Sequence, residues 1–142
     1  MKAISLWQPW ASLWLTDAKI HETRHWPTSH RGWLLVHAAK RQIDDYDGDR
    51  IDEICEGIWG NHWGQDLPRG ALIGTVNLVD CVRVETMPAG HHETDDYECG
   101  NFADGRYAWR RDAFRLFQQP IPYRGQQGFF EVPDDILPKL AA

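Results

Sequence analysis

The segment ALIGTVNLVDCVRV at residues 71–84 constrains the possible folds of this chain more than any other part of its sequence. It is rich in β-branched residues, and apolar and polar side chains alternate over part of its length, which is typical of a long β-strand. Five shorter segments are also predicted to be strands, at residues 2–5, 21–25, 33–37, 107–117 and 125–132. Several strands with few helices favour an α+β fold, a small β-barrel of about five to six strands flanked by short helices.

A short helix is predicted after Pro9, because proline is favoured at the first helical position. The apolar residues that follow are spaced at i, i+3 and i+4 and make one face, and the helix is expected to end near Asp17. Elsewhere we expect a surface helix at 44–57, a long polar loop with a helical turn at 86–105, and a short terminal helix at 133–140.

The composition is that of an ordinary globular protein, with 42% hydrophobic and 25% charged residues among 142, and it predicts one domain over residues 1–142. The formal net charge of −6 argues against a protein that coats long nucleic acid by charge alone, but it leaves room for a local basic pocket. Three cysteines without a CxxC pair predict free thiols. The sequence has no signal-peptide or transmembrane pattern, so we expect a cytoplasmic protein that does not contact a membrane.

The polar segment around residue 93 contains several groups that can bind metal ions. They lack HExxH or any other defined ligand spacing, so a surface loop is the favoured interpretation and no metal site is predicted. The sequence also lacks a P-loop and a Rossmann glycine pattern, and no cofactor is expected. The metal-binding residue types in this segment are His91, His92, Glu93, Asp95 and Asp96.

Four sequence blocks resemble the ASCH family of the PUA-like superfamily and follow in the family's order. They are SLWQPWASL at 5–13, KIHETRHW at 19–26, RGWLLVHAAKR at 31–41 continued by GALIGTVNLVDC at 70–81, and YAWRRDAFRLFQQPIPYRGQQGFFEVP at 107–133. The second block resembles the family signature G-x-K-x-x-E-x-R, with Asp17 in place of the leading glycine. The resemblance implies one ASCH domain with a PUA-like barrel and a cleft that binds RNA or a nucleotide.

The signature residues Lys19, Glu22 and Arg24 are all present and are the predicted catalytic or cleft-lining residues. Alternate residues of a strand share a face, so Glu22 and Arg24 should point the same way, while Thr23 points to the other face. Lys19 should enter from the preceding turn. Two cations and one carboxylate on one wall can hold a phosphate or the polar edge of a base. Without the resemblance, an ion pair that only closes the barrel rim would be the favoured interpretation.

Further residues are candidates for binding the substrate, and each has a structural alternative. Gln8 can hydrogen-bond a base or cap the helix, and Trp10 can stack on a base or pack in the core. His37 can lie at the mouth of the site or be a satisfied core histidine. The remaining candidates are Trp26, which we expect at the cleft edge, Lys40 after a buried strand, and Arg110 and Arg124 near the last strands.

Three function classes are compatible with these features. The favoured hypothesis is a module that binds RNA, another single-stranded nucleic acid, or a nucleoside or nucleotide. The second is a hydrolase, either a metal-independent ribonuclease or an enzyme like the ASCH amidohydrolases that act on N4-acetylcytidine. Those enzymes use a threonine nucleophile where this chain has Glu22, so Glu22 would instead activate water. The third is a scaffold protein that binds another protein through a Trp-rich surface.

Overall fold

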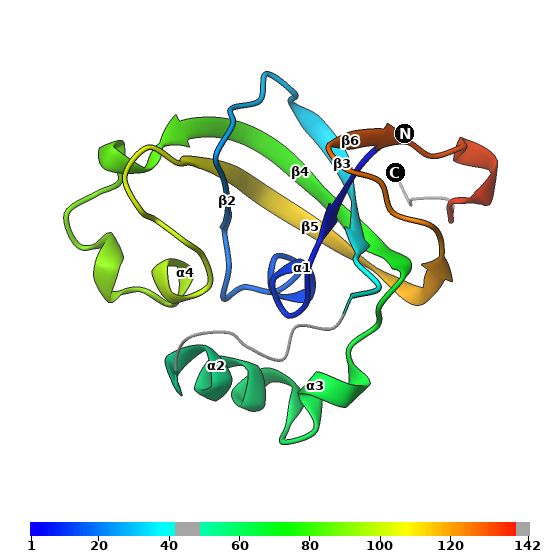
Figure 1. Cartoon of the computed structure of the whole chain (residues 1–142), viewed down its shortest axis with the longest axis horizontal. Helices are drawn as coiled ribbons and strands as arrows, with labels where there is room; N and C mark the ends of the chain where they lie inside the picture. Colours follow the sequence, from blue (N-terminus) through cyan, green and yellow to red (C-terminus); the bar gives the residue numbers. More distant parts are fainter. Residues whose placement is uncertain (42–48, 139–142) are drawn as a thin grey trace.

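The computed structural model describes residues 1–41 and 49–138, and its centre is one six-stranded sheet. The sheet curls into a half-barrel, and the strands follow in the order β2-β5-β4-β3-β1-β6 (Figure 1). β1 and β3 are parallel, and the other neighbouring strands are antiparallel. The predicted α+β class is confirmed. The strands are β1 (Lys2–Leu6), β2 (His21–Arg24), β3 (Gly32–Ala38), β4 (Ala71–Arg83), β5 (Tyr107–Pro122) and β6 (Phe129–Glu131).

The long strands β4 and β5 pair along almost their whole length and form the middle of the sheet. β5 continues to Pro122, beyond the predicted end at residue 117, because its last residues pair with the start of β4. β6 begins only at Phe129, whereas the sequence predicted a strand from residue 125. Gly128 immediately before it has a φ of 67°, a left-handed conformation that does not continue an extended strand.

Short helices cover one side of the sheet. They are α1 (Trp10–Leu13), α2 (Asp49–Trp59), α3 (Trp63–Asp66) and α4 (Asp95–Glu98), with 3-10 turns at Val84–Thr86, His91–Glu93 and Asp134–Ile136. Figure 1 shows α4 beside the start of β2, with α2 and α3 below α1. The first part of the predicted helix at 44–57 lies outside the described residues. The predicted terminal helix is only a 3-10 turn within its described part.

The first helix ends earlier than predicted, at Leu13, because side-chain hydrogen bonds form a turn after it. The hydroxyl of Thr16 donates to the carbonyl oxygen of Leu13 at 2.6 Å and accepts from the amide of Ala18 at 3.3 Å. Among the residues described, only glycines have positive φ, so Asp17 forms this turn without the left-handed backbone that glycine would permit.

Apolar side chains pack on both faces of the sheet. One cluster, which includes Ile4, Trp14, Val36 and Trp109, lies between α1 and the sheet. A second cluster around Leu72 and the end of β5 packs on the other face. A third joins α1 to α2, α3 and the buried thiols Cys55 and Cys99. None of the helices in the described part of the chain has the length and apolarity needed to cross a membrane.

Candidate functional site

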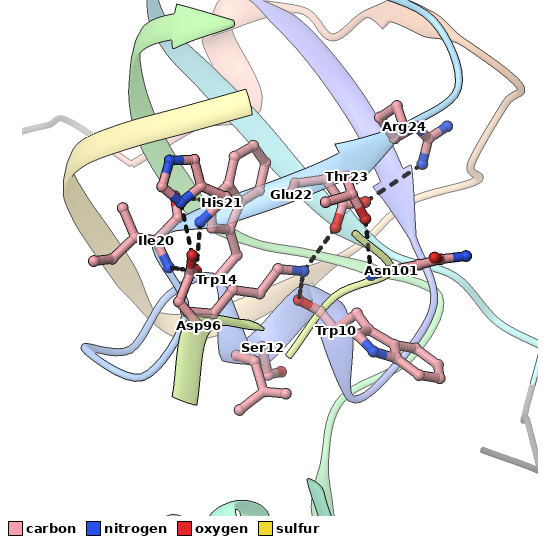
Figure 2. Close-up of polar contacts among 12 residues, drawn as sticks. Trp10, Ser12, Trp14, Ile20, His21, Glu22, Thr23, Arg24, Asp96 and Asn101 are labelled. Carbon is pink, nitrogen blue, oxygen red and sulfur yellow. Dashed lines mark hydrogen bonds and ion pairs between the residues drawn. The ribbon is translucent and has the colours of Figure 1, made fainter. Parts of the chain in front are cut away.

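Lys19, Glu22 and Arg24 form one connected ion-pair network. The Lys19 ammonium donates to Oε1 of Glu22 at 2.7 Å, and Nη1 of Arg24 lies 3.5 Å from Oε2 of the same carboxylate. Figure 2 shows Glu22 with these two contacts on either side. Arg24 also lies 5.4 Å from the centre of the Trp26 ring. The Glu22 carboxylate is therefore held in one orientation by two cations.

Lys19 is completely buried and lies behind Glu22. Its ammonium also donates to the carbonyl oxygen of Trp10 at 3.0 Å and lies 5.9 Å from the Trp14 ring centre. A buried ammonium requires such partners, because a buried charge without a compensating partner lowers the stability of the fold by several kcal/mol. Lys19 thus positions Glu22 from inside the protein. Of the three signature residues, Glu22 and Arg24 are the ones that border the surface.

The turn that carries Lys19 is fixed by a buried arginine from β5. The Arg111 guanidinium donates to the carbonyl oxygens of Trp14 at 3.2 Å and Lys19 at 2.6 Å, and also to that of Thr16. Burial lowers the pKa of Arg111 from its ordinary value, which nearby carboxylates partly oppose. The hydrogen-bond donors of Arg111 are therefore used inside the protein and not for a ligand.

A second tether joins the signature segment to α4. Oδ1 of Asp96 accepts hydrogen bonds from the backbone amides of Ile20 at 2.6 Å and His21 at 2.8 Å, and Oδ2 lies 2.7 Å from Nδ1 of His21 (Figure 2). Burial by itself raises the pKa of Asp96, but hydrogen bonds from His21 and His91 bring it well below its ordinary value. The interpretation of residues 91–96 as a plain surface loop is therefore wrong for Asp96, which is only 5% exposed.

A cleft of about 730 Å³ opens in front of these residues. Glu22 and Arg24 contribute its charged wall, and Trp7, Trp10 and Trp26 contribute aromatic surface. Trp26 packs edge-on against Trp109 and Phe129, which fixes its ring, whereas Trp7 is 48% exposed. The other lining residues include Ser5, Asn101, Arg106, Gln126 and Gln127.

A basic pocket of about 690 Å³ adjoins the cleft and shares Ser5, Gln126 and Gln127 with it. Three exposed cations contribute to its lining, Lys40, Arg69 and Arg124. The described part of the chain gives none of the three a salt bridge.

His37 is buried and contributes to the lining of this basic pocket. Its Nδ1 is 2.8 Å from the Ser5 hydroxyl, and its Nε2 is 2.7 Å from the carbonyl oxygen of Tyr123. Burial lowers the pKa of His37, and the hydrogen bond to the Tyr123 carbonyl only partly opposes this effect. Because a carbonyl oxygen can only accept, Nε2 carries the proton and Nδ1 accepts from Ser5. His37 is thus both a hydrogen-bonded core histidine and a residue lining the pocket.

The predicted binding residues fall into three groups. Trp10 and Trp26 line the cleft, and His37, Lys40 and Arg124 line the basic pocket. Gln8 and Arg110 line neither. The amide group of Gln8 contacts the backbone and hydroxyl of Ser12 and the carbonyl of Pro68, which is the capping alternative. Arg110 is exposed on β5.

Sequence reasoning missed several residues that the structure places in the cleft. Trp7 belongs to the same SLWQPW block as Trp10. Its position directly after β1 was the available signal that it lies at the end of a strand, where the cleft is. Arg106 donates to the carbonyl oxygens of Thr23 and Asn101, both at 3.0 Å, and so brings the 100–106 segment against β2. No local pattern indicates this contact, because its partner lies 83 residues away.

The ASCH domain model matches residues 4–117, a range that includes β1 through the middle of β5 and the whole signature segment. The chain belongs to the ASCH domain family. ASCH domains have a PUA-like fold, and the curled six-stranded sheet of this chain agrees with that fold.

Curated relatives match a shorter region. Activating signal cointegrator 1 from Homo sapiens and the same protein from Mus musculus are each 33% identical to this chain over 81 residues. The matched region is 56% of this chain and 14% of either relative, so the chain spans a small part of their length. The similarity supports the family assignment and concerns one region of those longer proteins.

Proposed function

We propose that this ASCH domain binds single-stranded RNA or a nucleotide, with a base in the cleft and the adjoining phosphate in the basic pocket. The observation that carries the proposal is that the two pockets share Ser5, Gln126 and Gln127. One pocket combines aromatic rings with fixed polar groups, and the other combines three cations. A nucleotide likewise has a flat base with polar edges at one end and a negatively charged phosphate at the other.

The cleft offers the contacts that a single-stranded base requires. Its volume of about 730 Å³ lies in the range of pockets that hold small ligands. Trp7 presents an exposed ring for stacking, and stacking on an aromatic side chain contributes about 1–3 kcal/mol per base. The Glu22 carboxylate can accept from an amino or imino group of the base. Arg24 has a buried Nε with no hydrogen-bond partner among the described residues, and a ligand oxygen would satisfy it after a small rotation.

The basic pocket suits a phosphate because Lys40, Arg69 and Arg124 bring three positive charges to its lining. The chain as a whole carries a formal charge of −6, so long-range attraction to a polyanion is weak and binding would depend on local groups of cations such as this one. We therefore expect a short binding footprint of a few nucleotides and a weak dependence of affinity on salt.

Fluorescence anisotropy with short labelled single-stranded RNA at low salt tests this proposal. Trp7→Ala should weaken binding by about 1–3 kcal/mol, and Arg124→Gln should reduce the salt slope by about 0.7, the value for one phosphate contact on a single strand. Arg50→Gln is the matched control, because Arg50 is an exposed arginine that lines neither pocket, and it should bind as the parent does. Absence of binding to RNA, single-stranded DNA and mononucleotides would refute the proposal.

A hydrolase is the second candidate, and it rests on the Glu22 carboxylate that is fixed at the cleft wall by Lys19 and Arg24. Glu22 would act as the general base for water, with Arg24 stabilising charge on a phosphate or an amide oxygen. The substrates to assay are RNA, with and without chelator, and N4-acetylcytidine. Turnover that disappears in Glu22→Gln, at a temperature at which circular dichroism shows that variant to be folded, would support this activity. Turnover that persists in Glu22→Gln and Lys19→Ala would show that the reaction occurs elsewhere.

A further inference from the structure

Three groups that bind transition metals meet beside the start of β2, although they are far apart in sequence. They are Nδ1 of His21, Nε2 of His91 and Oδ2 of Asp96, and all three atoms lie within 4.8 Å of one another. Oδ2 of Asp96 is 2.7 Å from the His21 nitrogen and 2.8 Å from the His91 nitrogen. Figure 2 shows the contact between His21 and Asp96. The cluster lies next to α4, and none of its three residues lines the cleft or the basic pocket.

The carboxylate of this cluster is oriented before any ligand arrives. Its Oδ1 accepts from the amides of Ile20 and His21, which directs Oδ2 toward the two imidazoles. Thr94 caps α4 through its hydroxyl, which accepts from the amide of Tyr97 at 3.2 Å and fixes the turn that carries Asp96. Backbone donors that hold a ligating carboxylate are typical of outer-sphere contacts in metal sites.

Aromatic contacts restrain both imidazole rings. The His91 ring lies 4.5 Å from the centre of the Phe102 ring and 5.8 Å from that of Tyr97, both edge-on. The His21 ring is 6.4 Å from Phe102. The side chains of His21 and His91 are 12% and 10% exposed, and that of Asp96 is 6% exposed. Little side-chain freedom remains to be lost on binding, and the cluster still reaches the surface.

We propose that His21, His91 and Asp96 form a binding site for a divalent transition-metal ion of the zinc type. Two imidazoles and one carboxylate are the ligand set of many zinc sites, with water in the remaining position. Imidazole ligands favour Zn²⁺ or Co²⁺ over Mg²⁺ and Ca²⁺, which prefer oxygen ligands. The ion would replace the two hydrogen bonds that now join the rings to Oδ2, with the ring protons moving to the other nitrogens.

This site would join β2 to the 91–96 segment. Asp96 already holds the amides of Ile20 and His21, which lie between Lys19 and Glu22 in the chain. An ion bound to both segments would therefore stabilise the turn behind the cleft. The proposal does not depend on nucleic-acid binding, and its test uses no nucleic acid.

Titration of the chelator-treated full chain with Co²⁺ tests the site, because cobalt bound by nitrogen and oxygen has visible absorption bands. We expect one Co²⁺ per chain, displacement by Zn²⁺, and a higher melting temperature with Zn²⁺. His91→Gln keeps a hydrogen-bond donor for Asp96 but removes the imidazole, and it should weaken binding by about tenfold or more. His92→Gln is the matched control, because His92 is the neighbouring residue, is 66% exposed and lies outside the cluster.

Two results would overturn the proposal. One is a wild-type chain that shows no saturable Co²⁺ or Zn²⁺ binding. The other is binding that is equally strong in His91→Gln and His92→Gln, since the ion would then be held elsewhere. Circular dichroism of the ion-free variants shows whether His91→Gln is folded. If it is not, His21→Gln serves as the second variant, and retention of the Co²⁺ spectrum in that variant would also refute the site.

Discussion

Replacing Glu22 with glutamine should destabilise the folded protein strongly, because the buried ammonium of Lys19 would lose its counter-ion. Lys19 is 0% exposed and Glu22 is 7% exposed, so water cannot solvate the charge that remains. Removing one partner of a buried ion pair costs about 3–5 kcal/mol. The glutamine oxygen and the Trp10 carbonyl, 3.0 Å from Nζ, still accept hydrogen bonds, so we expect the lower end, about 3 kcal/mol. For a chain of this length that corresponds to a fall in melting temperature of roughly 10 °C.

Urea unfolding followed by tryptophan fluorescence measures this change in the free energy of unfolding. The informative comparison is a double-mutant cycle of Lys19→Met, Glu22→Gln and the two combined. The double variant leaves no buried charge unpaired, so it should be less destabilised than the sum of the single variants, by about 2 kcal/mol. Arg50→Gln is the control, since it removes exposed pairs with Glu53 and Asp95 and should change the free energy of unfolding far less than Glu22→Gln does.

The reasoning is refuted if Glu22→Gln costs less than about 1 kcal/mol and the two single changes are additive. Such a result would mean that the Lys19 ammonium is solvated or carries no charge in the folded protein. Lys19 could then no longer be regarded as the residue that positions Glu22.

Three further predictions follow from buried groups outside this pair. Because burial lowers the pKa of His37 below its ordinary value of 6.5, the unfolded chain binds a proton more readily than the folded one. Stability should therefore fall as the pH drops below 6.5, and in urea unfolding at several pH values His37→Gln should show a smaller fall. Burial raises the pKa of Cys55 to about 12 and that of Cys99 to about 11, so neither thiol should react with iodoacetamide at neutral pH until the protein is unfolded, as mass spectrometry can check. Gly74→Ala would place a Cβ against the carbonyl oxygen of Arg115 and should cost about 1–3 kcal/mol in urea unfolding, whereas an unchanged midpoint would contradict the close approach of β4 and β5.

Much of the fold was predictable because strands leave local patterns in a sequence. The β-branched run at 71–84 predicted β4 almost to the residue. The family signature pointed to Glu22 and Arg24, which line one cleft, but Thr23, which the period of two along β2 placed on the other face, contributes to the same lining. Helix lengths were predicted less well. α1 ends at Leu13 because Thr16 closes a turn with its own side chain, which competes with a longer helix.

The sequence by itself therefore determined the family, most of the strand pattern and two charged residues of the cleft, Glu22 and Arg24. Only the tertiary structure decided that Lys19 is buried while Glu22, Arg24 and Arg106 line the cleft. Lys19 is buried because Trp10 and Trp14 enclose it, and a basic residue in a short motif does not reveal its own exposure. The meeting of His21 with His91 and Asp96 was likewise decided by contacts across about 70 residues. Periodicity reports the face on which a side chain lies, whereas burial and long-range partners depend on how distant segments pack against that face.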